Sequence, residues 1–188
     1  MIAYGFIAIL QMASIFTIIS IIGAIFDFRY ESILIFLGVG IIRKSTGGAH
    51  ASSINSCMVI SVLSITMLST MSRYLLCVPI DLYINVFISL IIFVICFIVF
   101  YLRVPVDSPN KPIVKLEKIV RLRKQSFIIL TVCCFISIVF ALLTSYDIRF
   151  YSIAVSIRLA VLWQTMTLTK TGAVIINRID LFITSFFH

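Results

Sequence analysis

Charged residues are scarce in this chain of 188 residues, and acidic residues are fewer than basic ones. Lys, Arg, Asp and Glu make up 12% of the sequence, with 15 basic residues against 7 acidic ones. Hydrophobic residues make up 62%, and the mean hydropathy is +1.21. These values exclude a soluble globular protein. They indicate a single integral membrane domain over residues 1–188, built from helical spans of about 20 apolar residues each.

Histidines are also few, and cysteines at paired spacings are lacking. The sequence has two histidines and five cysteines, and no two cysteines show Cys-x-x-Cys spacing or zinc-type spacing with a histidine. We therefore expect no disulfide framework, no metal site and no cofactor. Four cysteines are interpreted as small buried hydrophobic residues, namely Cys77, Cys96, Cys133 and Cys134.

Long apolar runs predict an all-α polytopic bundle with about six hydrophobic segments. They cover residues 2–26, 32–42, 54–77, 82–102, 125–145 and 150–168. No signal-peptide cleavage site precedes Asp27, so the first segment is expected to stay in the membrane. The second run would extend only roughly 16 Å as a helix, about half of the hydrocarbon thickness. Either its helix continues into the polar stretch that follows, or the chain stops and dips into the membrane at Gly47-Gly48.

The distribution of basic residues predicts the orientation of the chain. Seven of them lie in the polar stretch 103–124, which we expect to be a cytoplasmic loop. They are Arg103, Lys111, Lys115, Lys118, Arg121, Arg123 and Lys124. Both termini and the stretch around Gly47 then also face the cytoplasm. The net charge of +8 thus sets topology, and no nucleic-acid partner is expected.

A single arginine, Arg158, lies near the middle of the last apolar run. A charged side chain at that depth is costly in lipid. We expect Arg158 to face the bundle interior and to pair with an acid or with carbonyl groups.

The stretch RKSTGGAHASSINSC, Arg43 to Cys57, places polar residues between two apolar runs. Arg43, His50 and Cys57 are spaced seven apart, so on one unbroken helix they would share a face, with about 10.5 Å between neighbours. That separation is too long for a hydrogen bond between an imidazole and a thiol. Gly47 and Gly48 are poor helix formers that readily adopt positive φ. We therefore predict a helix break that brings His50 back over Cys57.

A new helix is expected after this break, with Cys57 about one turn from its start. Ser52, Ser53 or Asn55 is suited to cap it. An imidazole beside a thiol is an arrangement for nucleophilic catalysis, and a nearby cation or helix N-terminus also favours the thiolate. Arg43 would serve that purpose or bind a substrate carboxylate. No acidic residue lies nearby in sequence, so Asn55, Ser52 or a backbone carbonyl is left to orient the histidine.

This pattern resembles the accessory gene regulator B family of Gram-positive bacteria, whose members are membrane cysteine endopeptidases that process quorum-sensing peptide precursors. The matching residues are Arg43, Gly47, Gly48, His50, Ala51 and Cys57. The segment VPVDSPNKPI, residues 104–113, resembles the Pro-x-Asp-x-x-x-Lys-Pro-Ile segment of that family. The segments YGFIAILQMASIF and QTMTLTKTG resemble its first span and its tail.

The resemblance implies a location in the cell membrane of a Gram-positive bacterium, a precursor peptide of the AgrD type as substrate, and a homodimer. His50 would take the proton of Cys57, whose thiolate attacks the peptide before its acidic C-terminal tail. The resulting acyl-thioester would then be closed to a thiolactone or lactone by the peptide's own thiol or hydroxyl. Basic residues would attract the acidic tail, namely Lys111, Lys115, Arg121, Arg123 and Lys124. The alternative is that these cations only fix topology and contact anionic lipid.

Two other classes of function remain open from the residues alone. A small transporter or channel would use the Gly-Gly segment as a re-entrant loop and Arg158 as a binding charge. Replacing Cys57 would then abolish flux and leave peptide cleavage unaffected. A non-enzymatic scaffold for signalling partners would tolerate Cys57→Ser.

Overall fold

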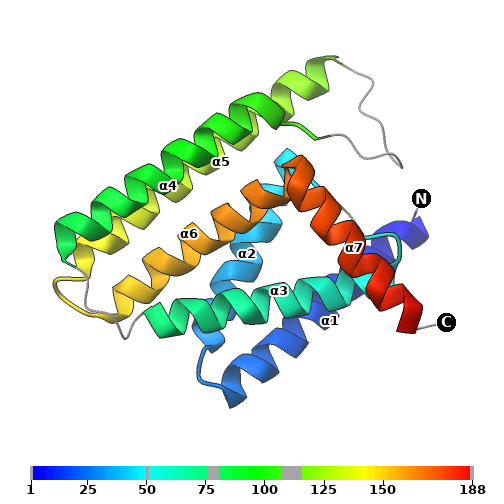
Figure 1. Ribbon diagram of the computed structural model, residues 1–188, viewed down its shortest axis with the longest axis horizontal. Helices are drawn as coiled ribbons and strands as arrows, with labels where there is room; N and C mark the ends of the chain where they lie inside the picture. Colours follow the sequence, from blue (N-terminus) through cyan, green and yellow to red (C-terminus); the bar gives the residue numbers. More distant parts are fainter. Residues whose placement is uncertain (1, 50, 76–80, 107–115, 187–188) are drawn as a thin grey trace.

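The computed structural model describes residues 2–49, 51–75, 81–106 and 116–186. This part of the chain forms seven α-helices and no β-strand, which confirms the all-α prediction (Figure 1). In chain order they are α1 (Ile2–Ile25), α2 (Arg29–Thr46), α3 (Ile54–Leu75), α4 (Leu82–Arg103), α5 (Leu116–Leu143), α6 (Arg149–Thr167) and α7 (Lys170–Phe186).

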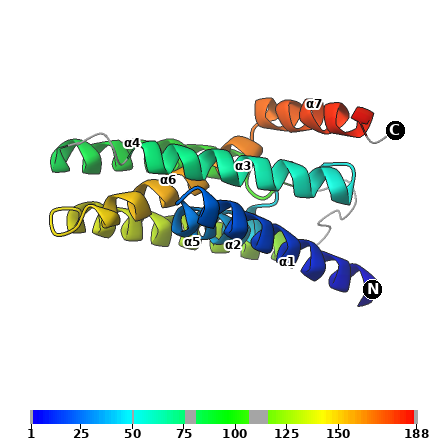
Figure 2. The same cartoon turned by 90° about the horizontal axis from the view of Figure 1, so that it is seen from below.

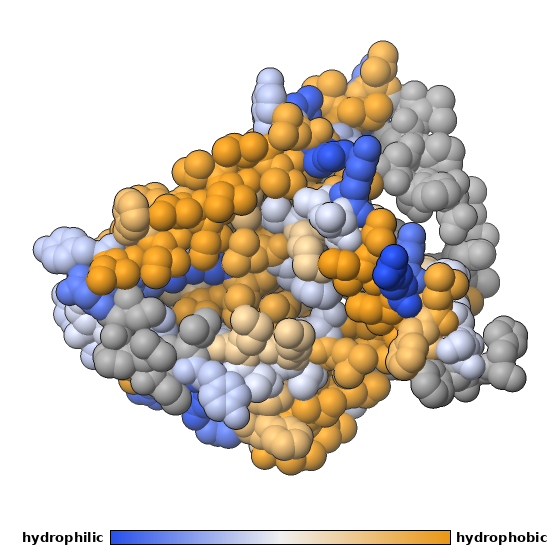
Figure 3. Space-filling view, in the orientation of Figure 1, coloured by the Kyte–Doolittle hydropathy of each residue, from blue (hydrophilic) through white to orange (hydrophobic). Residues whose placement is uncertain are grey.

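Four of these helices are long and apolar enough to cross a membrane. The apolar segments are Phe6–Ile25, Ile54–Tyr74, Leu82–Arg103 and Leu116–Leu143. A fifth span results if α6 and α7, which meet at a bend of 87°, are counted together. Hydrophobic residues cover most of the face seen in Figure 3, as expected for side chains that contact lipid. The fold is that of a polytopic helical membrane bundle.

Helices α2 and α6 pack against one another near the centre of the molecule. Figure 2 shows α6 between a row containing α3 and α4 and a row containing α1, α2 and α5, with α7 outside both rows. Gly38 of α2 lies against Ala160 of α6, so closely that a Cβ at Gly38 would be 3.0 Å from the Ala160 Cβ. The absence of a side chain at Gly38 therefore lets the two backbones approach.

The short second apolar run is part of a longer helix. Helix α2 comprises 18 residues and extends from Arg29 to Thr46, about 27 Å at 1.5 Å per residue. It thus includes Glu31, which is buried and accepts a hydrogen bond from the Ser152 hydroxyl. Of the two alternatives for this run, the helix continues past Ile42, and it ends immediately before Gly47.

Two segments outside the predicted apolar runs are helical. The predicted end of the loop 103–124 is wrong, because residues from Leu116 onward belong to α5. The residues from 116 to 124 include no proline or glycine and are rich in leucine, lysine and arginine, which are good helix formers. The tail after Thr169 also forms a helix, α7, whose first turn is capped by the Thr169 hydroxyl, which accepts from the Gly172 N–H at 3.0 Å.

Arg158 faces the interior as predicted, with 5% of its surface exposed. The expected partner was wrong, because the Arg158 Nε donates to the Ser137 hydroxyl at 3.2 Å. Its Nη2 has no hydrogen-bond partner among the described residues. A second interhelical pair, Ser72 with Ser156 at 3.0 Å, links α3 to α6.

Candidate functional site

The predicted helix break occurs at the two adjacent glycines. Gly47 has φ +73° and Gly48 has φ +131°, both in the region that residues with a side chain rarely adopt. Space is also lacking, because a Cβ on Gly47 would lie 2.2 Å from the Val106 carbonyl oxygen, and one on Gly48 would lie 2.9 Å from Thr167 Oγ1. Glycine is therefore required at both positions, and residues 43–57 do not form one continuous helix.

The chain around the glycines is held by hydrogen bonds to the end of α6. The buried Gln164 side chain donates through Nε2 to the Gly47 carbonyl at 2.7 Å and to Thr46 Oγ1 at 2.9 Å. The Ala49 N–H donates to the Thr167 carbonyl at 3.2 Å. These bonds fix the backbone that leads from α2 toward Cys57.

Helix α3 begins with Ser53 as its cap, one of the three candidates named from the sequence. The Ser53 Oγ accepts from the Ser56 N–H at 3.1 Å, and the Cys57 N–H donates to the Ser53 carbonyl at 3.0 Å. Cys57 therefore lies in the first turn of α3, where unpaired N–H groups and the helix dipole favour a negative charge. This is the location in which a thiolate is stabilised by a helix N-terminus.

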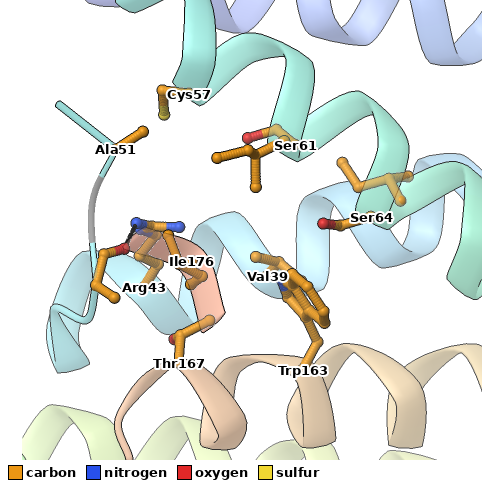
Figure 4. Close-up of a pocket in the computed structure, with 12 residues that line it drawn as sticks. Val39, Arg43, Ala51, Cys57, Ser61, Ser64, Trp163, Thr167 and Ile176 are labelled. Carbon is orange, nitrogen blue, oxygen red and sulfur yellow. Dashed lines mark hydrogen bonds between the residues drawn. The ribbon is translucent and has the colours of Figure 1, made fainter. Parts of the chain in front are cut away.

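Arg43 approaches the same position from the last turn of α2. Its guanidinium donates to the Ala49 carbonyl, the bond drawn as a dashed line in Figure 4. Figure 4 shows Cys57 and Arg43 pointing into one pocket from two helices. The two groups are close enough for Coulomb attraction between the Arg43 cation and a Cys57 thiolate. The predicted association of Arg43 with Cys57 is thus present in the fold, although its catalytic role stays a prediction.

The pocket in front of Cys57 is formed by four helices and the Gly-Gly loop. Its cavity volume is small, about 40 Å³, and the pocket is partly open to the exterior. The lining includes Val39 of α2, Ile60, Ser61, Ser64 and Ile65 of α3, Trp163 and Thr167 of α6, and Ile176 of α7. Ser61 and Ser64 follow Cys57 along α3, to its right in Figure 4, and the Trp163 ring lies below Ser64 in that view. The pocket is thus mostly apolar, with polar groups on α3 and single polar side chains at Arg43 and Thr167.

An acidic residue that was not predicted contacts this site. Asp180 of α7 is buried, with 6% of its surface exposed, and its Oδ2 accepts from the Ser52 N–H at 2.7 Å. The two residues are 128 positions apart. A signal was present in the sequence, because Ile176, Asp180 and Ile183 recur at helical spacing and place an acid on an apolar face.

The other predicted site residues fall into two groups. His50, Lys111 and Lys115 lie outside the described residues. Arg121, Arg123 and Lys124 lie in the first turns of α5 and are not among the residues that line the Cys57 pocket.

Within that second group, Arg123 has a structural contact. Its guanidinium donates to the Tyr101 carbonyl at 2.8 Å and lies 5.1 Å from the centre of the Tyr101 ring. Arg123 therefore joins α5 to α4, whereas Arg121 and Lys124 are exposed.

Comparisons with known proteins agree with the resemblance seen in the sequence. The family model described as Accessory gene regulator B matches residues 1–168. A protein of Clostridium perfringens (strain SM101 / Type A) described as AgrB-like is 32% identical over 184 residues, which cover 96% of this chain and 86% of that protein. A second AgrB-like protein, from Clostridium perfringens (strain 13 / Type A), is 30% identical over 185 residues, with coverage of 96% and 86%. No solved structure matches the chain.

Proposed function

Since the chain belongs to the accessory gene regulator B family, we propose that it is a membrane cysteine endopeptidase that cleaves a quorum-sensing precursor peptide, with Cys57 as nucleophile and His50 as base. The observation that carries this proposal is the placement of Cys57. The Gly47-Gly48 break sets this cysteine in the first turn of α3, beside the Arg43 cation and at the wall of a pocket between helices.

In the first step, His50 takes the proton of the Cys57 thiol, and the sulfur attacks the peptide carbonyl that precedes the acidic tail. Arg43 favours the thiolate, or binds a carboxylate of the peptide. The C–N bond then breaks, and His50 returns its proton to the leaving amine. The tail departs with a free amino group, and the rest of the peptide is bound to Cys57 as an acyl-thioester.

In the second step, a cysteine or serine of the same peptide attacks the thioester. Its thiol or hydroxyl proton passes to the Cys57 sulfur by way of His50, so the enzyme is regenerated and a thiolactone or lactone is released. The apolar walls of the pocket, among them Ile60 and Trp163, support this step because they keep water away from the thioester. Ring closure within one bound peptide also has the advantage of proximity. No ATP is needed, since a thioester is exchanged for a bond of similar or lower energy.

The acidic tail is proposed to bind the basic residues that precede and begin α5. Arg121 and Lys124 are exposed at the start of this helix, and Lys111 and Lys115 precede it in the sequence. Arg123 is the weakest member of this set, because its guanidinium already contacts Tyr101.

The test is co-expression of the chain with its precursor peptide and detection of the cleaved tail and the cyclic product. Cys57→Ala and His50→Ala are expected to insert normally and to leave the precursor uncut. Cys134→Ala is the matched control, because Cys134 is a free cysteine of α5 that does not line the pocket. Normal processing by either site variant would refute the assignment. Loss of a transported solute with intact cleavage would favour a transporter instead.

A further inference from the structure

Helices α2 and α5 pack against one another and leave an open groove between them. They belong to the same row of helices in Figure 2. The groove has a volume of about 440 Å³, which is within the range typical of sites for small molecules. Its lining includes Ile41, Lys44 and Ser45 of α2 and Gln125, Ile128 and Ile129 of α5. None of these residues lines the pocket of Cys57, so the groove is a separate feature of the molecule.

The groove has a polar end and an apolar end. Lys44 lies in the last turn of α2, and Gln125 lies near the start of α5, where Arg121 and Lys124 are also exposed. Charged side chains of this kind are placed at the interface between membrane and water. Farther from this end, the Ile41 and Ile128 side chains are 56% and 52% exposed. Exposed isoleucines on a membrane span contact acyl chains, so the groove passes from the interface into the hydrocarbon layer.

The polar end carries hydrogen-bond donors that the protein itself does not use. Lys44 is exposed and takes part in neither of the two ion pairs formed among the described residues. The Gln125 amide is also exposed and forms no hydrogen bond within the described part of the chain. No acidic residue is among those that line the groove. An ammonium group and an amide thus converge from two helices on one position, which suits an anion with several acceptor oxygens.

A second groove runs along α5 beside the first. It has a volume of about 470 Å³ and is lined by Lys124, Phe127, Ile128, Thr131 and Val132. Successive residues of a helix are rotated by about 100°, so the residues of the first groove and those of the second lie on opposite sides of Ile128. Ile128, which lines both grooves, is therefore a ridge between them. Each groove has a lysine at the end nearer the water, Lys44 in one and Lys124 in the other.

We propose that this surface of α2 and α5 binds one anionic diacyl glycerophospholipid. The phosphate accepts from Lys44 and Gln125, and the two acyl chains lie in the grooves on either side of Ile128. Basic pockets between membrane helices are known to hold anionic lipid head groups. A zwitterionic lipid binds less tightly, because its own cation offsets the attraction between Lys44 and the phosphate. The site uses none of the cysteine chemistry, and Arg121 and Lys124 are not needed to hold the phosphate.

The experiment is a lipid titration of the full-length protein, purified in a mild detergent and observed by native mass spectrometry. The two probes are phosphatidylglycerol and phosphatidylcholine with identical acyl chains, and the Kd of the first bound lipid is measured for each. We expect phosphatidylglycerol to bind at least about fivefold more tightly, since one lysine near the membrane surface contributes about this factor.

Lys44→Gln is expected to remove about fivefold of the affinity for phosphatidylglycerol and to leave the affinity for phosphatidylcholine nearly unchanged. Lys170→Gln is the matched control, because Lys170 is an exposed lysine of α7 that lines neither groove. It should bind both lipids as the wild type does. If Lys44→Gln does not accumulate, Gln125→Leu replaces it. This variant keeps the approximate size of the side chain, loses its donors, and should weaken phosphatidylglycerol binding at least about threefold.

Ile128→Trp tests the acyl chains separately from the head group. Ile128 is 52% exposed, so a larger side chain can be placed there without disturbing the interior, and it would obstruct both grooves. Binding of both lipids should become at least several-fold weaker. Glycerol phosphate, which has the anionic group and no acyl chain, should not displace bound phosphatidylglycerol.

Three results would overturn the proposal. They are equal affinity for the two lipids, equal losses in Lys44→Gln and Lys170→Gln, and displacement of phosphatidylglycerol by glycerol phosphate. The first two would show that the lipid responds only to the overall charge of the protein or to none of it, and the third would show an anion site without acyl grooves. Because precursor processing is not measured, each of these results leaves the peptidase assignment of Cys57 unaffected.

Discussion

Replacing Gly48 with alanine tests whether the conformation of the Gly-Gly loop is needed for activity. The added Cβ would lie 2.9 Å from Thr167 Oγ1 and 3.3 Å from Gln164 Nε2, at φ +131°. Holding a non-glycine residue at such a φ costs about 1–3 kcal/mol, and the contacts add to this because Gln164 and Thr167 are the groups that anchor the loop. We expect a total of at least about 2 kcal/mol. That value would lower the ratio of native to rearranged loop about 30-fold, and kcat/KM would fall by up to the same factor.

The assay measures precursor cleavage together with the amount of inserted protein. Gly40→Ala is the matched control, since Gly40 lies in α2 with no atom within 4 Å of an added Cβ. It should process normally, and its helix should gain up to about 1 kcal/mol. Gly47→Ala should be more damaging than Gly48→Ala, because its Cβ would meet the backbone oxygen of Val106, which cannot rotate away. Wild-type kcat/KM in correctly inserted Gly48→Ala protein would refute the argument.

Three further variants test the remaining parts of the site. Arg43→Met should lower kcat/KM at least about tenfold by removing the cation beside Cys57, and Arg43→Lys should restore part of it; equal rates for both variants would contradict a role for charge. Ser53→Ala should destabilise the start of α3 by about 1 kcal/mol and lower Tm, whereas Ser53→Asp, which can also cap, should not. The double variant Arg121→Gln, Lys124→Gln should raise KM, most clearly at low salt, where the attraction to the acidic tail is least screened. Arg123→Gln should instead lower Tm, because it loses the contact with Tyr101. An unchanged KM in the double variant would refute tail binding by Arg121 and Lys124 and would leave them only a role in membrane topology.

The parts of the fold that could be predicted are those encoded over short distances in the sequence. The apolar runs 2–26, 54–77 and 82–102 predicted the bounds of α1, α3 and α4 to within about two residues, at the helix ends that the structure describes. The adjacent glycines predicted the break, and the polar residues after them limited the cap to three candidates, of which Ser53 is the one observed, because backbone freedom and capping depend on local chemistry. The location of His50 over Cys57 stays a prediction.

The parts that were missed depend on polar helical residues or on distant contacts. Hydropathy does not detect the first turns of α5, where charged residues form a helix outside the apolar run. Hydropathy ended the last apolar run at residue 168, next to the end of α6 at Thr167, but it did not predict α7 or its bend of 87°, which depends on how the two helices pack. Asp180 was overlooked for a related reason, since its partner Ser52 is 128 residues away.

The bend between α6 and α7 has a mechanical consequence for the nucleophile. Gln164 and Thr167, which grip the Gly-Gly loop, belong to the final turn of α6, and α7 leaves from the next few residues to contact Ser52 and Ile60. The loop before Cys57 is thus held at one end by α6, through Gln164 and Thr167, and at the other by α7, through Asp180. A displacement of α7 would therefore shift Ser52 and the start of α3. A ligand that binds to α7 would in this way change the position of the Cys57 sulfur.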